Sequence, residues 1–134
     1  MATSMRLPGL IRQAIAEATI ADGVACIVGT ADYSAAVAAA DPVAGVIGIA
    51  TVDGGGSIAS GGTVDIVTNG IYPGIAMASI TQGQAVTVGD SAGGLKPAAP
   101  SAGANAMVIG IAQEDATSGE RVAVQIGIYL MQGA

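Results

Sequence analysis

Few side chains in this sequence could do chemistry, and histidine is not among them. The chain has one Cys, three Tyr, ten Asp or Glu and four Lys or Arg. Without an imidazole, Ser-His-Asp and Cys-His nucleophiles and His-ligated zinc are excluded. Cys26 lies in the apolar run Val24–Val28, with no basic neighbour to lower the pKa of its thiol. We therefore expect Cys26 to be a small buried side chain.

The acidic and glycine-rich segments match no catalytic or metal-binding pattern. Asp53, Asp65 and Asp90 are single and scattered, whereas a calcium site needs converging carboxylates. Glu114 and Asp115 are adjacent, so in a strand their side chains point apart instead of sharing a proton. The Gly54–Gly56 run has no Lys and fits neither the P-loop nor the dinucleotide pattern. The sequence thus predicts a protein that is not an enzyme and holds no metal and no cofactor.

The side chains that remain are suited to contacts with another protein. Arg6, Leu7 and Arg12 lie in an N-terminal segment that has no acidic residue. We expect this segment either to dock on an acidic partner surface or to be a disordered terminus. Tyr72 and Tyr129 each follow a Gly-Ile pair and are interpreted as equivalent positions of a repeat. Two such rings cover the ends of a core or meet a neighbouring subunit, and a ligand-stacking pair is the alternative.

Charge and hydropathy exclude two kinds of partner. The net charge of −6 repels a phosphate backbone, so nucleic acid is not expected to bind. The mean hydropathy is +0.64, but the longest uncharged stretch, 66–89, contains Pro73 and several glycines and cannot form a spanning helix. We expect no membrane association. The chain has a single Cys, and no signal peptide is readable at its N-terminus. Both observations favour a protein that is made in a cytoplasm and is not exported.

Three blocks recur in the same order along the chain and predict an internal duplication. In each copy short runs rich in Val and Ile alternate with turn residues, which is typical of strands. The blocks are 23–30 with 83–90, the motif Val-Ile-Gly-Ile-Ala at 46–50 and again at 108–112, and 64–72 with 122–129. The last pair requires one extra residue, Asn69, which we interpret as a β-bulge. The pseudo-repeats therefore span about 23–75 and 83–134.

The predicted architecture is a small all-β barrel or sandwich built from these two strand units. A chain of 134 residues is one domain, which we place at 13–134, preceded by an extended arm at 1–12. The Ala-rich segment 33–40 is interpreted as loop and strand, with a single helical turn as the alternative. Small side chains bury little apolar area, so a lone copy is modest in stability and oligomerisation is expected.

The order of these motifs resembles that of the capsid cement, or decoration, proteins of tailed bacteriophages. The resemblance covers about 12–128 and is carried by the succession at 21–29, 46–50, 80–90, 108–112 and 116–124. It implies a small all-β protein, commonly a homotrimer, that binds the major capsid protein on the outside of an icosahedral head and stabilises the shell. The Ala-rich segment and the long arm depart from the short members of the family.

Two other functions are weighed against this one. A head-fibre base or minor tail protein is the nearest alternative, which we expect less because nothing follows Ala134 to form a shaft. A carbohydrate-binding module is the other, but three Tyr make a poor supply of aromatic platforms. If the resemblance holds, the protein is made in the host bacterial cytoplasm and is located on the exterior of the virion.

Overall fold

The regular secondary structure of the chain is almost all β-strand. The computed structural model describes residues 5–42 and 44–133, and within them there are thirteen strands, one short 3-10 turn and no α-helix. No helix in this part of the chain is long and apolar enough to cross a membrane. The all-β prediction is confirmed. The strands are β1 (Leu7–Pro8), β2 (Ile11–Ala16), β3 (Ile20–Ala21), β4 (Ala25–Val28), β5 (Ser34–Val37), β6 (Val46–Thr51), β7 (Ser57–Ile58), β8 (Thr63–Val67), β9 (Gly70–Ile75), β10 (Ala85–Val88), β11 (Leu95–Pro97), β12 (Asn105–Ala112) and β13 (Arg121–Gln132).

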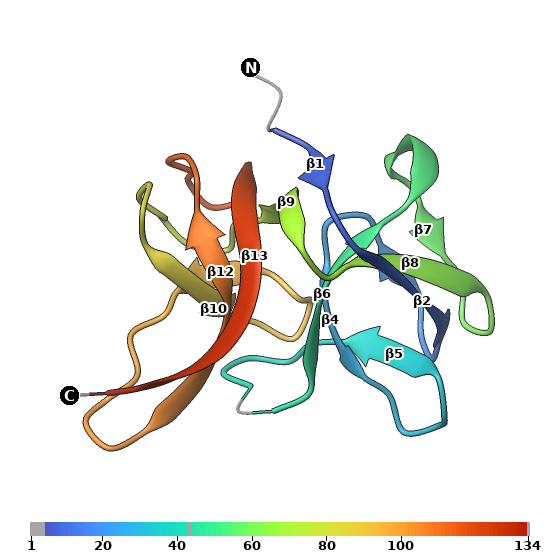
Figure 1. The fold of residues 1–134 in the computed structure, drawn as a ribbon, viewed down its shortest axis with the longest axis horizontal. Coiled ribbons are helices and arrows are strands. Elements are labelled where there is room, and N and C mark those ends of the chain that lie inside the picture. The colour runs from blue at the N-terminus through green and yellow to red at the C-terminus, as the bar shows by residue number, and fades with distance from the viewer. Residues whose placement is uncertain (1–4, 43, 134) are drawn as a thin grey trace.

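Two strand units lie side by side (Figure 1). The first is a closed barrel in the order β2-β5-β4-β6-β8, in which only the β2–β5 pair is parallel. The second is a six-stranded sheet in the order β1-β9-β13-β12-β10-β11. A parallel bridge between Ala76 and Leu95 connects the end of β9 to β11. This bridge occupies the place of the β2–β5 pair in the barrel, so the two units have the same strand order.

Backbone hydrogen bonds repeat between the units and confirm the duplication. The Ala38 N–H donates to Ala25 O in the first unit, and the Ala98 N–H donates to Ala85 O in the second. The β3–β7 ladder, which pairs Ile20 with Ile58, corresponds to an antiparallel bridge between Ile80 and Ala116. Residues of the first half of each unit therefore correspond at an offset of 60.

The repeat boundaries differ from those predicted. The sequence places 70–75 in the first repeat, but this segment is β9, which pairs with β13 in the second unit. Asn69 does not form the predicted bulge, because it lies between β8 and β9 where the chain crosses from the barrel to the sheet. The register shifts lie instead between Cys26 and Ile27 and between Val108 and Gly110. The extra residue, Asn69, therefore lies in the connection between β8 and β9 and not within a pair of hydrogen-bonded strands.

Two apolar cores hold the units together. One core fills the barrel and contains the inward side chains of β2, β4, β6 and β8, among them Cys26 and Ile66. The other joins Ile49 and Val67 of the barrel to Leu95, Ile109 and other side chains of the second unit. The two units therefore share a core and form a single packed domain.

The Val-Ile-Gly-Ile-Ala motif is explained by its position. In the first unit the motif lies in β6, whose residues 46–50 are all buried because one face lines the barrel and the other contacts the second unit. A Cβ at Gly48 would lie 2.1 Å from Val67 O, and one at the equivalent Gly110 would lie 2.2 Å from Gln125 O. Only glycine lets the neighbouring strand approach this closely.

The predicted arm at 1–12 is part of the folded body over its described residues. Ile11 and Arg12 begin β2 of the barrel, whereas Leu7 and Pro8 pair with Ile71 and Gly70 of β9. We call residues 5–16 the strap, because this segment is paired with both units. Residues 1–4 lie outside the described residues.

Candidate interaction surface

The strap contains a concentration of exposed apolar side chains. Nine large hydrophobic side chains are exposed among the described residues, and five belong to the strap: Met5, Leu7, Leu10, Ile11 and Ile15. Along β2 the even positions Ala14 and Ala16 face the barrel core, so the odd positions point outward. Exposed apolar side chains in one segment are typical of a protein-binding surface.

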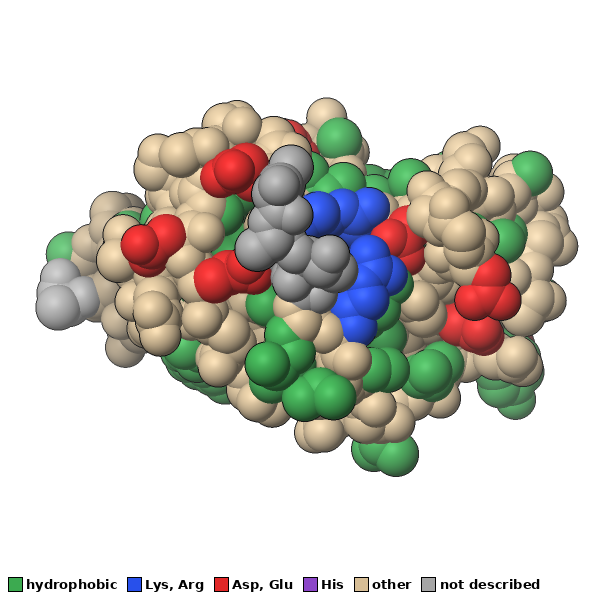
Figure 2. All heavy atoms as spheres, turned by 90° about the horizontal axis from the view of Figure 1, so that it is seen from above, with side chains coloured by type: hydrophobic (Ala, Val, Ile, Leu, Met, Phe, Trp, Pro, Cys, Tyr) green, Lys and Arg blue, Asp and Glu red, His purple; other side chains and the backbone are tan. Residues whose placement is uncertain are grey.

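The strap also differs in charge from the rest of the chain. It holds Arg6 and Arg12 and no acidic residue, while all ten Asp and Glu residues follow it. Figure 2 views the molecule from the end where the N-terminal segment lies, and Lys and Arg side chains gather there beside hydrophobic ones, with an acidic side chain next to them and others further out. This face is thus suited to a partner with acidic and apolar groups.

A buried polar cluster fixes the strap to the two units. The Tyr72 hydroxyl donates to Asp22 Oδ1 at 2.8 Å and accepts from Thr51 Oγ1 at 2.7 Å. Arg6 Nη1 donates to the same hydroxyl at 3.0 Å, and its guanidinium lies 5.2 Å from the centre of the Tyr72 ring. The ring therefore joins the strap, through Arg6, to the first unit, through Asp22 and Thr51.

Asp22 is the charged centre of this cluster and is almost fully buried. The Val52 N–H donates to its Oδ1 at 2.8 Å, and Arg121 Nη2 of β13 lies 3.1 Å from its Oδ2. The second contact has the geometry of an ion pair and not of a hydrogen bond. Because Asp22 belongs to the first unit and Arg121 to the second, the pair holds the units in one orientation.

Burial raises the pKa of Tyr72 above its ordinary value of 10.0. The hydrogen bond to Asp22 and the charge of this carboxylate raise the pKa further, while Thr51 and Arg6 lower it. The hydroxyl is therefore protonated at neutral pH and can donate to Asp22.

The structure brings together only some of the predicted contact residues. Arg6 and Tyr72 are in direct contact, and Leu7 is exposed on the adjacent strand β1. Arg12 is exposed on β2, opposite Ile66 in the ladder with β8. Tyr129 is 43% exposed on β13 and pairs with Val108. Tyr72 and Tyr129 thus lie in different strands and environments and are not equivalent positions.

Asp22, Thr51 and Arg121 are members of the cluster that the sequence does not reveal. They lie far from Tyr72 along the chain, and the Asp22–Tyr72 pair alone spans 50 residues. One weak sequence feature points to Asp22: it is an acidic residue directly before the first repeated block, which begins at Gly23.

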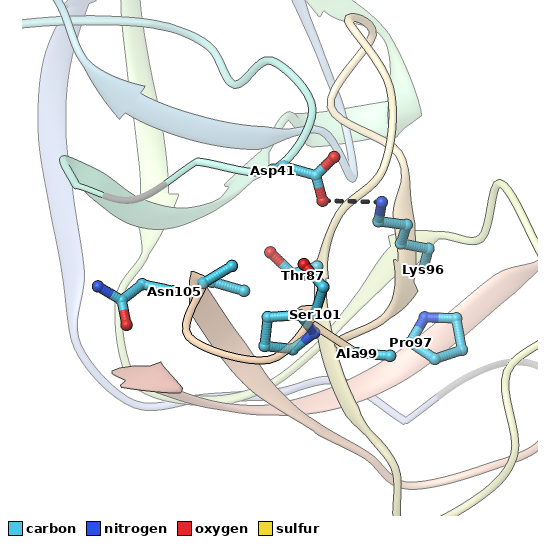
Figure 3. Close-up of a pocket in the computed structure, with 10 residues that line it drawn as sticks. Asp41, Thr87, Lys96, Pro97, Ala99, Ser101 and Asn105 are labelled. Atoms are coloured by element: carbon cyan, nitrogen blue, oxygen red, sulfur yellow. Dashed lines mark ion pairs between the residues drawn. The ribbon is translucent and has the colours of Figure 1, made fainter. Parts of the chain in front are cut away.

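Cys26 and a pocket beside Lys96 are two further places to consider for chemistry in the described part of the chain. Cys26 is buried, which raises the pKa of its thiol to about 12. A pocket of about 500 Å³ is lined by Asp41, Lys96, Ser101 and Asn105, among others. Figure 3 shows Asp41 and Lys96 facing each other, 2.8 Å apart, so their charges neutralise one another. Within the described residues, no three His, Cys, Asp or Glu side chains gather as a metal site would require.

Comparison with known proteins shows the fold. No family model and no curated protein matches the chain. Among solved structures, the chain is similar to the head fiber gp8.5 N base in bacteriophage phi29, with a TM-score of 0.63 and 20% sequence identity. The similarity covers 88% of this chain and 93% of that chain. The two proteins therefore share nearly the whole of one fold.

Proposed function

We propose that this chain is a structural protein of a phage particle, which binds the outer surface of an icosahedral head and bridges neighbouring capsid subunits. The observation that carries the proposal is the similarity of nearly the whole fold to a protein of a phage head fiber. The sequence resemblance to capsid cement proteins supports the same role independently. The function is binding and not catalysis, and its site is the virion exterior.

The strap is the surface that meets the major capsid protein. It presents Leu7, Leu10 and Ile11 to solvent beside Arg6 and Arg12. Strand β1 ends the six-stranded sheet, so its outer edge can pair with a strand of the shell.

Several copies act together in this role. A homotrimer, as the resemblance implies, presents three straps at once. Each weak contact then raises the effective concentration of the others, so modest individual affinities add up to stable attachment. The bound assembly connects capsid subunits that would otherwise separate under internal pressure.

A head-fibre base is the second candidate, and the comparison with the phi29 head fiber favours it specifically. The two candidates differ in what is attached to the face of the protein that is turned away from the capsid. A cement protein leaves that face bare on the particle, whereas a fibre base carries a further fibre segment or protein. Mass spectrometry of the proteins that remain with the chain after gentle disassembly of particles distinguishes them.

The direct test is binding to heads of the parent virus that lack this chain. Leu10→Asp places a negative charge on the strap, at a side chain that is 68% exposed, and is expected to lower occupancy at least ~10-fold without unfolding the protein. Leu130→Asp is the matched control at a 52% exposed leucine outside the strap, and is expected to bind normally. Absent binding of the native chain contradicts the function, whereas equal binding of both variants contradicts only the role of the strap.

A further inference from the structure

Two equivalent turns, one in each unit, have different residues at the same unusual backbone position. The turns are 29–34 and 89–94. Each is closed by a hydrogen bond from its first N–H to its last carbonyl, Gly29 to Ser34 at 3.0 Å and Gly89 to Gly94 at 2.8 Å. The fifth residue has a positive φ in both, +58° at Tyr33 and +75° at Gly93.

Glycine suits this position and tyrosine does not. A residue with a bulky side chain is strained at positive φ, whereas glycine adopts this conformation freely. The second unit shows that the fold accepts glycine here. The strained Tyr33 is moreover 81% exposed, so its ring adds little to the stability of the isolated chain. Strain of this kind marks positions that serve an external contact.

Both turns are braced by a carboxylate, but from different places: Asp90 of the second turn accepts from the Ala92 and Gly94 N–H groups of its own turn, whereas the first turn is braced from outside. The Glu17 carboxylate accepts hydrogen bonds from the backbone N–H groups of Thr30 and Ala31 and from the Ser34 hydroxyl, all between 2.9 and 3.0 Å. Methionine, at position 77, corresponds to Glu17 in the second unit and can accept no such set. The bracing fixes the backbone of the turn that carries the exposed ring, which lowers the entropy lost on binding.

The turn of the second unit shows what such a turn contacts. Gly93 is buried against the first unit, where the Ala25 N–H donates to its carbonyl at 3.1 Å. A Cβ at Gly93 would lie 2.5 Å from Val24 Cγ1. At the offset of 60, the residues of the second unit that correspond to Val24 and Ala25 are Gln84 and Ala85. Gln84 is exposed and Ala85 is half-buried. The chain therefore makes one such contact internally, between its second turn and its first unit. The equivalent turn of the first unit, 29–34, and the equivalent surface of the second unit, Gln84–Ala85, do not meet each other within the chain.

We propose that the Tyr33 turn of one copy packs onto the Gln84–Ala85 surface of a second copy, repeating between chains the contact that the two units make within one chain. The ring of Tyr33 requires a wider approach than Gly93. Gln84 stands in place of Val24; its side chain is exposed and accepts one hydrogen bond, from the Thr81 N–H at 2.8 Å, which must break if the side chain turns aside to admit the ring. Gln82 and Gln84 of the partner surface are uncharged, and the carboxylate beside them, Asp115, accepts a hydrogen bond from the Gln82 N–H at 2.7 Å. Such a contact joins unlike surfaces, so it forms a closed ring of copies when the rotation closes.

Cross-linking of two single-cysteine additions tests the contact directly. Asp32→Cys and Gln82→Cys, at exposed neighbours of Tyr33 and Gln84, are purified separately, mixed, and treated with a short bis-maleimide, while the buried Cys26 serves as the unreactive background. The proposal predicts dimers linked 32 to 82 in the mixture, and few in either variant alone. Absent links, or equal links in the separate variants, overturn it.

A second measurement separates the contact from folding. Tyr33→Gly installs the residue of the second unit, so the proposal predicts a chain that is at least as heat-stable but has a dissociation constant for self-association raised at least ~10-fold. Tyr129→Ala is the control at another exposed tyrosine and is expected to associate normally. Sedimentation velocity over a concentration series gives the result. A native chain that is monomeric at micromolar concentration, or Tyr33→Gly with unchanged association, contradicts the proposal, which does not depend on any capsid contact.

Discussion

Replacing Tyr72 by Phe removes one hydroxyl from the polar cluster while keeping the ring. The hydroxyl makes three hydrogen bonds, to Asp22, Thr51 and Arg6, at 2.7 to 3.0 Å. The bond to the buried Asp22 carboxylate is charge-assisted, and such bonds contribute about 2 kcal/mol to the free energy of unfolding. For a chain of this size, that loss lowers Tm by about 7 °C.

Two measurements check this prediction. Thermal unfolding gives the loss of stability, with Tyr129→Phe as a control because this ring is partly exposed on β13. Hydrogen exchange of the Gly9 amide, which donates to Asn69 O at 2.9 Å, reports on the strap. Exchange at Gly9 accelerates in Tyr72→Phe, because Arg6 has lost its hydrogen-bond acceptor. If Tyr72→Phe unfolds within 1 °C of the native chain and Gly9 keeps its protection, the cluster does not hold the strap.

Three further predictions concern single positions. Hydrogen bonds lower the pKa of Glu17 from 4.5 to about 2, so its contribution to stability is complete above pH 4.5 and is lost as the pH falls towards 2. Glu17→Gln therefore flattens the fall of Tm over this pH range. Parallel curves of Tm against pH for the variant and the native chain would be evidence against the bracing. Gly48→Ala forces a Cβ onto Val67 O and destabilises by about 2 kcal/mol in urea titrations, whereas Gly127→Ala, with open space around it, does not. The Cys26 thiol, buried and with a pKa of about 12, reacts with a maleimide only after denaturation, and rapid labelling of the native chain would show that it is accessible.

The strand content and the duplication could be predicted from the sequence because both depend on local patterns. Runs of Val and Ile bounded by glycine form the predicted strands β4, β6, β8, β10 and β12. The motif Val-Ile-Gly-Ile-Ala marks the strand whose glycine admits a neighbouring strand in each unit. The short Ala-rich segment 33–40 forms strand β5, as predicted, since eight residues are too few for a stable helix.

The repeat boundary could not be placed correctly from the strongest local match. The two Gly-Ile-Tyr segments, at 70–72 and 127–129, suggest equivalent strands. In the structure β13 is one continuous strand of twelve residues, whereas the first unit ends at Val67 and β9 begins the second. The true correspondence is Ile11–Ala16 with Ile71–Ala76, where only Ile11, Ile15 and Ala16 are identical to their partners. The correspondence is hard to see in the sequence because the three positions between them differ: Arg12, Gln13 and Ala14 align with Tyr72, Pro73 and Gly74.

The polar cluster and the strained turn depend on tertiary structure. Arg6 and Tyr72 are 66 residues apart in sequence, and nothing local connects them. Positive φ at Tyr33 contradicts the preference of its residue type, so it becomes visible only beside Gly93 in the equivalent turn. Both features lie at contacts between units or at the surface, where local preference is overridden.

The central claim is that this fold binds a phage head through its strap. Electron cryomicroscopy of the parent virus, compared with particles that lack this chain, tests it most directly. We predict extra density on the outer surface of the head that fits the paired strand units, with residues 5–16 turned towards the capsid subunits. Identical maps of the two particles, or density in which the strap points away from the shell, would contradict the account.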